Sequence, residues 1–363
     1  MFRSAIKYLA LLINLFFSLM YIFGLLAAVV PSNKFVWFSY FGLFFPLLVL
    51  IQLGFGIFWL FRRHKWYCLI SFGLLILTLP AVNRVFSVPL RQKTAVAQRP
   101  TLKLLTYNIS IFSGEKKYKE IMRLIEEQDA DIVCLQEFGF YNRNSRLNEK
   151  DILTRFYIKY PYRHLWYKNQ RGDMSWGVAT FSKYPIIKKR KVNYASAYNV
   201  SIYSDIVING DTLRLFNNHL ESNKFTLGDM KRYKELSDNF NSEKLRSVTE
   251  KMSTKLSSAY RVRAKQAQII AEEIAQSPYP VVACGDFNDV PQSYAYHTIA
   301  KNMTDIIIAT KWGYHYTFHS NGILVNIDHV LASKNRIIPL SSNIIHIDYS
   351  DHYPVLAKFQ IKH

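Results

Sequence analysis

The feature that most constrains this chain is a set of three long apolar runs within its first 82 residues. Residues 6–30, 35–61 and 66–82 supply about 25, 27 and 17 mainly apolar positions, and a helix needs roughly 20 to cross a bilayer. Residues 1–100 contain no aspartate or glutamate. The sequence therefore predicts three transmembrane helices, with residues 1–82 forming a membrane anchor.

Basic residues around these runs predict the orientation of the anchor. The first connection contains only Lys34, whereas the amino terminus and the second connection contain Arg3, Lys7, Arg62, Arg63 and Lys65. Because lysine and arginine favour the cytoplasmic side, three crossings place the rest of the chain outside. We therefore expect a multi-pass inner-membrane protein with its larger part in the periplasm. A cleaved signal peptide is the alternative for the first run, but that run is long and lacks a small-residue cleavage site.

Residues 83–100 contain two prolines and no sustained apolar period, so we interpret them as a linker to a domain at 101–363. Residues 102–107 alternate as a strand, 118–128 have helical spacing, and 131–135 predict a second, buried strand. A strand, a helix and a strand within about 35 residues are typical of an α/β fold. The pair Asn209 and Gly210 predicts a hairpin, and 256–275 predict a helix that packs on a sheet.

Polar residues recur where the predicted strands of this domain end. Residues 281–284 form one such buried strand, Gly285 follows, and Asp286 and Asn288 come next. Considered alone, this pair fits either a metal-assisted phosphate site or a simple turn. The same pattern recurs beside other apolar strands, where layered α/β proteins gather their active sites. The full set is Asn108, Glu137, His219, Asp286, Asn288, Asp328, Asp351 and His352.

These residues occur in motifs that resemble the endonuclease/exonuclease/phosphatase superfamily, which includes deoxyribonuclease I and neutral sphingomyelinases. The motifs are TYNIS, CLQEF, NNHLES, CGDFNDVP, NIDHVLAS and SDHYPV, in the family's order between residues 101 and 361. The resemblance implies a four-layer α/β sandwich, in which two packed sheets are flanked by helices. It also implies hydrolysis of a phosphate ester with Mg²⁺ or Mn²⁺.

The resemblance also implies a role for each residue. Glu137 would be the main metal ligand, supported by Asn108 and Asp351, because hard divalent cations favour oxygen donors. Asp286 would orient or deprotonate the attacking water, and Asn288 would hold that water or a phosphate oxygen. His219, and His352 paired with Asp328, would contact the scissile phosphate.

The substrate stays open at this stage. Thirty-six basic and 26 acidic residues remain after position 100, and a net charge of about +10 favours polyanions such as nucleic acid, phospholipid headgroups and inositol phosphates. We expect the lipid bilayer as a partner and predict no protein partner. The alternatives to a phosphoesterase are a non-catalytic, membrane-tethered binding protein and a nucleic-acid repair endonuclease. The repair endonuclease is disfavoured for two reasons. Ser110 stands where some repair members carry Asp, and Asn326 stands where many relatives carry Arg.

Overall fold

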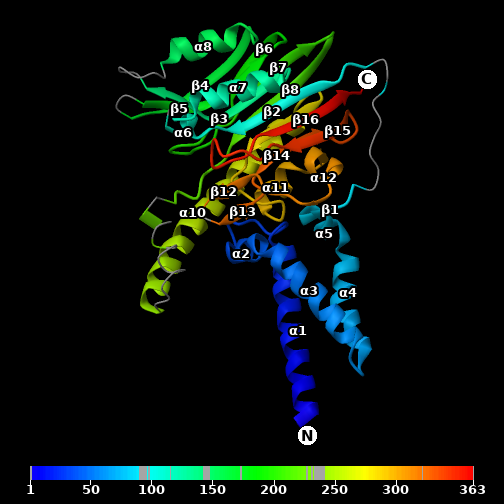
Figure 1. Cartoon of the computed structure of the whole chain (residues 1–363). Helices are drawn as coiled ribbons and strands as arrows, with labels where there is room; N and C mark the ends of the chain where they lie inside the picture. Colours follow the sequence, from blue (N-terminus) through cyan, green and yellow to red (C-terminus); the bar gives the residue numbers. More distant parts are fainter. Residues whose placement is uncertain are drawn as a thin grey trace.

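The computed structural model describes residues 2–89, 96, 99–114, 116–141, 148–171, 174–225, 228–229, 232, 242–320 and 322–362. Figure 1 shows a layered α/β body that sits on a group of helices from the first 85 residues. The predicted α/β class, with two packed sheets and helices on their outer faces, is confirmed.

Only the first apolar run forms one continuous helix long and apolar enough to cross a membrane, among the residues described. This is α1 (Phe2–Leu26). The second run is α2 (Trp37–Leu43) and α3 (Phe45–Leu60), bent by 66°. In the third, η1 (Lys65–Tyr67) and α4 (Cys68–Leu77) meet α5 (Leu79–Val85) at 72°.

The prediction of three unbroken helices is therefore corrected to one helix and two bent pairs. Pro46 and Pro80 stand in the first turn of α3 and of α5. Proline has no N–H to donate to the preceding turn, so a helix tends to restart there. A count of apolar residues alone does not predict this break in the helix.

Polar side chains fasten the helices of the anchor from inside. Nδ2 of Asn14 donates to Oγ of Ser71 (2.9 Å), and Nε1 of Trp59 donates to Oδ1 of Asn14 (3.0 Å). The buried Gln52 pairs with Ser18. Apolar side chains cover the outside, among them Leu12, Leu47, Leu50, Leu69 and Ile76. The interior also contains an apolar cluster that includes Tyr21, Phe45 and Leu48, so the apolar exterior is what differs from a water-soluble helical bundle.

The first large sheet has the order β15-β16-β2-β3-β5-β4. Its centre is a parallel pair, β2 and β3, and its other neighbours are antiparallel. The strands are β2 (Leu102–Asn108), β3 (Ile132–Tyr141), β4 (Tyr162–Arg171), β5 (Met174–Ser182), β15 (Ile337–Ile344) and β16 (Val355–Ile361).

The second large sheet has the order β10-β14-β9-β8-β7-β6, also around one parallel pair, β8 and β9. The turn at Asn209 and Gly210, both with positive φ, joins β7 to β8 as predicted. The strands are β6 (Ile186–Lys191), β7 (Ile202–Ile208), β8 (Asp211–His219), β9 (Val281–Asp286), β10 (Met303–Asp305) and β14 (Asp328–Ser333).

Three apolar clusters hold these layers together. One lies between the sheets and includes Leu104, Leu215 and Cys284. The second packs α7 (Tyr118–Gln128) and α8 (Glu149–Tyr157) on the first sheet, and the third packs α10 (Ser242–Ala275) and α11 (Tyr294–Ile299) on the second. Two short elements, α6 (Ser110–Gly114) and α12 (Ile306–Thr310), complete the helices beside them. The three cysteines are free and buried.

The sequence predicts a helical excursion from residue 223, with a break near 239–242, and then a helix over 256–275. Helix α10 begins at Ser242 and joins the end of that excursion to the predicted helix in one element. Only its second half packs on the sheet, through residues such as Ala267 and Ile270.

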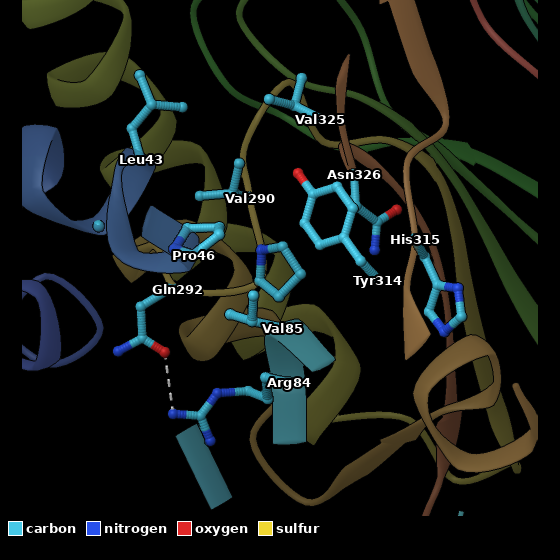
Figure 2. Close-up of a pocket in the computed structure, with 12 residues that line it drawn as sticks. Leu43, Pro46, Arg84, Val85, Val290, Gln292, Tyr314, His315, Val325 and Asn326 are labelled. Carbon is cyan, nitrogen blue, oxygen red and sulfur yellow. Dashed lines mark hydrogen bonds between the residues drawn. The ribbon is translucent and has the colours of Figure 1, made fainter. Parts of the chain in front are cut away.

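The α/β body lies directly on the anchor. Strand β1 (Phe86–Ser87), within the predicted linker 83–100, pairs with β11 (Gly313–Tyr314). Residues 90–95, 97 and 98 of that linker lie outside the described part. Nearby, β12 (Phe318–Ser320) and β13 (Ile323–Val325) form a small hairpin. A cavity of about 20 Å³ remains at the junction, between α2, α3 and α5 on one side and the body on the other (Figure 2).

Candidate active site

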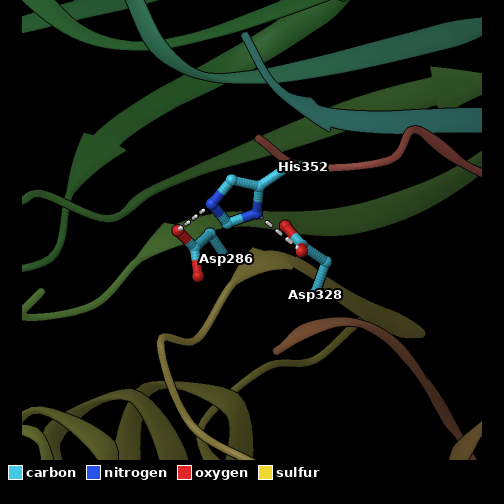
Figure 3. Close-up of side chains that lie close together, drawn as sticks. All are labelled: Asp286, Asp328 and His352. Carbon is cyan, nitrogen blue, oxygen red and sulfur yellow. Dashed lines mark hydrogen bonds and ion pairs between the residues drawn. The ribbon is translucent and has the colours of Figure 1, made fainter. Parts of the chain in front are cut away.

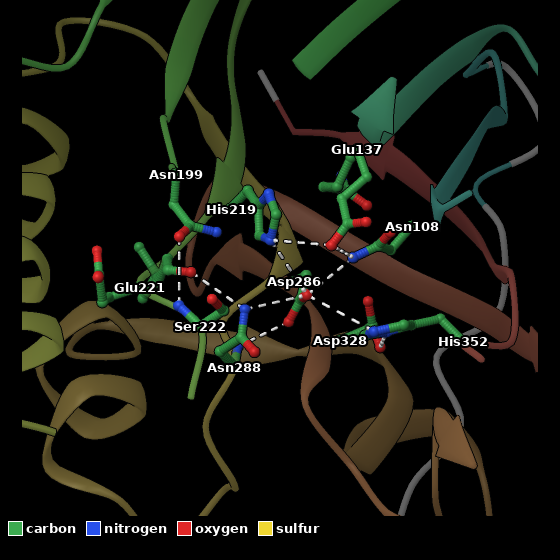
Figure 4. A network of polar contacts seen from close by, with 12 residues as sticks. Asn108, Glu137, Asn199, His219, Glu221, Ser222, Asp286, Asn288, Asp328 and His352 are labelled. Carbon is green, nitrogen blue, oxygen red and sulfur yellow. Dashed lines mark hydrogen bonds and ion pairs between the residues drawn. The ribbon is translucent and has the colours of Figure 1, made fainter. Parts of the chain in front are cut away.

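The two parallel strand pairs bring the predicted site residues to one edge of the sandwich (Figure 4). Asn108 ends β2 and pairs with Gln136 of β3, and Glu137 follows Gln136 directly. His219 ends β8 and Asp286 ends β9, where the two residues pair in register. Parallel strands place their carboxyl ends on the same side, so both sheets present polar groups at one place.

Gly285 and Asn288 explain the local shape of the GDFND segment. Gly285 has a φ of +121°, and a Cβ at this position would lie 2.1 Å from the backbone oxygen of Asn218. Only glycine fits here. Asn288 has a φ of 52°, and its N–H donates to Oδ1 of Asp286 (2.7 Å). This is a turn stabilised by its own aspartate, and it carries Asp286 to the edge where the other polar strand ends meet.

A bulge in β3 aims Glu137 into the site. The ladder with β5 shifts between Gln136 and Phe138, and Glu137 between them has a φ of 49°. Non-glycine residues in this conformation store strain and mark functional positions. Oε1 of Glu137 accepts from Nδ2 of Asn108 (3.4 Å). Burial, together with the charge of Asp351, raises the pKa of the Glu137 carboxyl.

Asp286 is the most connected carboxylate of the site. Its Oδ2 accepts from Nδ2 of Asn108 and from Nδ2 of Asn288, both at 3.1 Å, and it is 1% exposed. Burial raises the pKa of Asp286, the charge of Asp328 adds to this rise, and His352 and His219 oppose it. The group is poised closer to neutral pH than an ordinary aspartate.

His352 and Asp328 form a buried ion pair. Nδ1 of His352 lies 2.8 Å from Oδ2 of Asp328, and Nε2 lies 3.8 Å from Oδ2 of Asp286 (Figure 3). Burial alone would lower the pKa of His352, but the carboxylates of Asp328 and Asp286 raise it to about 10. The ligand atoms of these three residues lie within 4.8 Å of one another, as in sites that hold a cation.

His219 has a buried nitrogen without a hydrogen-bond partner. Its Nε2 lies 3.6 Å from Oδ2 of Asp286 and 3.8 Å from Oε1 of Glu137, both beyond hydrogen-bond distance. Burial lowers the pKa of His219 and favours the neutral ring. Twelve other buried side-chain atoms of the described residues also lack a partner, so what distinguishes Nε2 of His219 is its place between two carboxylates.

Asp351 is placed differently from the other predicted residues. It is exposed, and its Oδ1 accepts from Oγ of Ser350 (3.2 Å). The compact group that could hold a cation consists of Asp286, Asp328 and His352 rather than the predicted ligands Glu137, Asn108 and Asp351. Asn108 connects the two groups, because its Nδ2 contacts both Glu137 and Asp286.

Further buried polar residues adjoin the site and were not singled out from the sequence. Glu221 is 3% exposed and accepts from Ser196 and Lys224, each at 2.5 Å. The buried Arg263 pairs with Asp289 (3.0 Å) and donates to the backbone of Glu221 (2.8 Å). The sequence carried a signal for two of them, because Glu221 lies two residues after His219 and Asp289 follows Asn288 directly.

Comparisons with known proteins agree with this architecture. Three solved structures share the fold: humanized TDP2 from D. rerio (13% identity, 72% of this chain and 99% of that one, TM-score 0.50), an endonuclease/exonuclease/phosphatase family protein from Leptotrichia buccalis (16%, 72% and 100%, 0.50) and an endonuclease/exonuclease/phosphatase from Beutenbergia cavernae (14%, 72% and 72%, 0.52). A search of curated proteins finds no match.

Family models match two parts of the chain. Residues 7–85 match a domain of unknown function. Residues 105–352, more than half of the chain, match the Endonuclease/Exonuclease/phosphatase family. The chain therefore belongs to the endonuclease/exonuclease/phosphatase family, whose known relatives are hydrolases of phosphate esters.

Proposed function

We propose that this protein is a membrane-anchored, divalent-metal-dependent phosphoesterase that hydrolyses phosphodiester or phosphomonoester bonds. The observation that carries the proposal is the convergence of carboxylates, amides and two histidines at one edge, with Nε2 of His219 left unpaired. A binding protein on the same fold would have no need for both an ion-paired histidine and buried carboxylates with raised pKa values.

The donor set fits a hard divalent cation. Burial raises the pKa of Asp286, and partial burial together with the charge of Asp351 raises the pKa of Glu137, whose side chain is 34% exposed. A cation bound beside these carboxylates would favour their ionised forms. Glu137, with Asn108 and Asp351 beside it, would hold Mg²⁺ or Mn²⁺, because Asp328 is already paired with His352. Bound there, the cation would polarise the phosphate and neutralise negative charge on its oxygens.

The remaining residues would handle the water and the phosphate. Asp286 would orient and deprotonate the attacking water, and its raised pKa suits a general base. Asn288 holds that carboxylate, since its Nδ2 donates to Asp286 and to the backbone of Leu220. His219 and His352 would donate hydrogen bonds to phosphate oxygens, with Asp328 keeping His352 oriented.

The full chain in detergent micelles provides the direct test, with a soluble chromogenic phosphodiester and a phosphomonoester as substrates. We expect turnover of at least one of them with Mg²⁺ or Mn²⁺, and its loss with chelator. Asp286→Asn and His352→Ala should each reduce kcat by about 10²–10⁴. Glu120→Gln, at an exposed ion pair with Lys117, is the matched control. Turnover that ignores chelator, or that survives both substitutions, would contradict the mechanism.

We further propose that residues 1–82 anchor the protein with three membrane crossings and that residues 101–363 form its catalytic domain on the periplasmic side. The apolar exterior of the helices, with polar side chains paired inside, supports a bilayer as their surroundings. A reporter fused after Lys93, which lies outside the described residues, should be active only beyond the cytoplasm. Activity inside the cytoplasm would reverse the orientation.

A further inference from the structure

The loop that follows Asp286 rests directly on the anchor. Gln292, six residues further on, is 1% exposed, and its Nε2 donates to the backbone oxygen of Gly24 in α1 (3.1 Å). Its Oε1 accepts from Nη2 of Arg84 in α5 (3.2 Å; Figure 2). At Gly42 in α2, a Cβ would lie 2.6 Å from the backbone oxygen of Gln292. Gln292 therefore joins the catalytic loop to the anchor, through its side chain to α1 and α5 and through its backbone to α2.

The wall of the site near His352 rests on the anchor as well. Phe318 of β12 pairs with His352, and their rings lie 5.1 Å apart. Val325, which pairs with Phe318 across the hairpin, lines the small cavity together with Asn326 and with Pro46 of α3. The site is thus held against the anchor by two separate segments.

These contacts limit how far the site can lie from the bilayer. Six extended residues span at most about 20 Å, so Asp286 lies no further than that from Gln292 and the end of α1. Helix α2, bent by 66° from α3, carries Trp37, which is 70% exposed, as expected for a helix at the interface. The catalytic groups therefore lie near the lipid headgroups.

The first half of α10 offers a surface for the same bilayer. Leu245, Val248, Met252 and Leu256 follow one another at spacings of three and four residues, so they share one face of the helix. Leu245 is exposed, the other three are half-buried, and none of the four belongs to an apolar core within the described residues.

This half of α10 lies beside the anchor. The hydroxyl of Tyr40 in α2 lies 2.9 Å from Oγ of Ser253 and 2.6 Å from Oγ of Ser257, and Figure 1 shows α10 descending next to α2. Arg246 and Lys255 flank the apolar face, and each is paired with a carboxylate, Arg246 with Glu250 (3.0 Å) and Lys255 with Asp229. The apolar stripe, rather than a net basic charge, is therefore what fits a membrane surface.

We infer that the substrate is the phosphate ester of a lipid headgroup in the same bilayer that holds the anchor. The inference rests on the proposed phosphoesterase function and names its substrate class. Lipid phosphates near this site are present at high local concentration.

The test uses the full chain in lipid nanodiscs with Mg²⁺, and measures release of water-soluble phosphate product. The discs contain phosphatidylcholine together with sphingomyelin, phosphatidylglycerol or a phosphatidylinositol phosphate. A soluble chromogenic phosphodiester and a DNA oligonucleotide are assayed in parallel. We expect cleavage of at least one lipid, about tenfold faster in the enzyme's own disc than in separate discs, which corresponds to about 1.4 kcal/mol of local advantage.

Two double variants separate the membrane contact from the chemistry. Leu245→Glu with Met252→Glu should reduce lipid cleavage about tenfold and leave the soluble diester unaffected, since about 1.4 kcal/mol of lost membrane contact is one factor of ten. Ser247→Glu with Thr254→Glu adds the same charge on the opposite, exposed face and should change neither.

The outcomes separate the lipid substrate from the phosphoesterase activity. Turnover of the soluble diester without cleavage of any lipid, or faster cleavage of DNA than of every lipid, overturns the lipid inference and leaves the phosphoesterase intact. Failure on every substrate overturns the phosphoesterase itself. An equal loss in both double variants would show that charge alone, and not the apolar face, is responsible, and would also overturn the inference.

Discussion

The imidazole of His352 lies between the carboxylates of Asp328 and Asp286, 2.8 Å from the first and 3.8 Å from the second. Asp328 begins β14 and Asp286 ends β9, and the two residues pair directly across the antiparallel ladder. His352 comes from the other sheet, just before β16. One ring therefore joins the two halves of the sandwich at the site, and Asp328 fixes which of its nitrogens faces Asp286.

Replacing Asp328 tests this arrangement. Asp328→Asn keeps the size of the side chain but removes the charge that holds the His352 ring, so we expect kcat to fall by about 10²–10⁴ with little change in KM. Steady-state kinetics on a soluble phosphodiester provide the measurement. Asp348→Asn, at an exposed aspartate four residues before His352, is the control and should behave as the wild type. Equal kinetics in the wild type, Asp328→Asn and Asp348→Asn would show that catalysis does not depend on the charge of Asp328 beside His352.

Glu137 should lower the stability of the metal-free protein. Its raised pKa means that the ionised carboxylate is unfavourable in the folded protein at neutral pH. Glu137→Gln should therefore melt no lower than the wild type in chelator.

Mg²⁺ or Mn²⁺ should raise the Tm of the wild type, because a ligand at a hundred times its Kd adds about 2.7 kcal/mol to the free energy of unfolding. The Tm of Glu137→Gln should not rise. Thermal melting of both proteins, with Glu127→Gln as an exposed control, measures this. A full metal-induced rise in Glu137→Gln would place the cation elsewhere, with the group formed by Asp286, Asp328 and His352 as the first candidate.

The sequence could predict the strand-end residues because their positions follow from chain direction alone. Once 102–107, 131–135 and 281–284 are strands, the residues after them lie at strand ends, and the parallel pairs bring Asn108, His219 and Asp286 to one edge. The direction of Glu137 could not be predicted. It depends on a bulge and a φ of 49°, which no residue type encodes by itself.

Contacts between distant segments also stayed hidden in the sequence. Gln292 pairs with Gly24 and Arg84, more than 200 positions away, and its own neighbours suggest only a turn. The bends at Pro46 and Pro80 were readable in principle, but a window of apolar residues gives proline no weight as a helix breaker. Such features arise from packing between elements, and a single sequence does not record it.

The contact between Gly42 and Gln292 should be sensitive to bulk. In Gly42→Val the new side chain would meet the backbone of Gln292 and the Cβ of Ala27, at 2.6 and 2.7 Å from its Cβ. Overpacking of this kind costs about 1–3 kcal/mol, so we expect a lower Tm and a lower turnover of a soluble diester. Gly54→Val is the control, because nothing lies within 4 Å of its Cβ. The same Tm and turnover in both variants would mean that the loop does not depend on the anchor.

Acid should weaken the protein through His164, far from the candidate site. His164 in β4 is 5% exposed, and its Nδ1 lies 2.9 Å from Oγ of Ser204 in β7, so it connects the two sheets. Burial, helped by the charge of Lys189, lowers the pKa of His164 to about 4. The folded protein thus keeps the ring neutral, whereas in the unfolded chain His164 takes up a proton once the pH falls below its ordinary pKa of about 6.5.

The stability due to His164 is therefore complete above pH 6.5 and is lost as the pH falls towards 4. The loss at pH 5 relative to pH 7 should be about 2 kcal/mol. His164→Gln cannot be protonated, so the difference in Tm between pH 7 and pH 5 should be smaller in this variant than in the wild type. His64→Gln, at an exposed histidine between the anchor helices, should keep the wild-type difference. If His164→Gln loses as much stability in acid as the wild type, the buried neutral ring is not what makes the fold sensitive to pH.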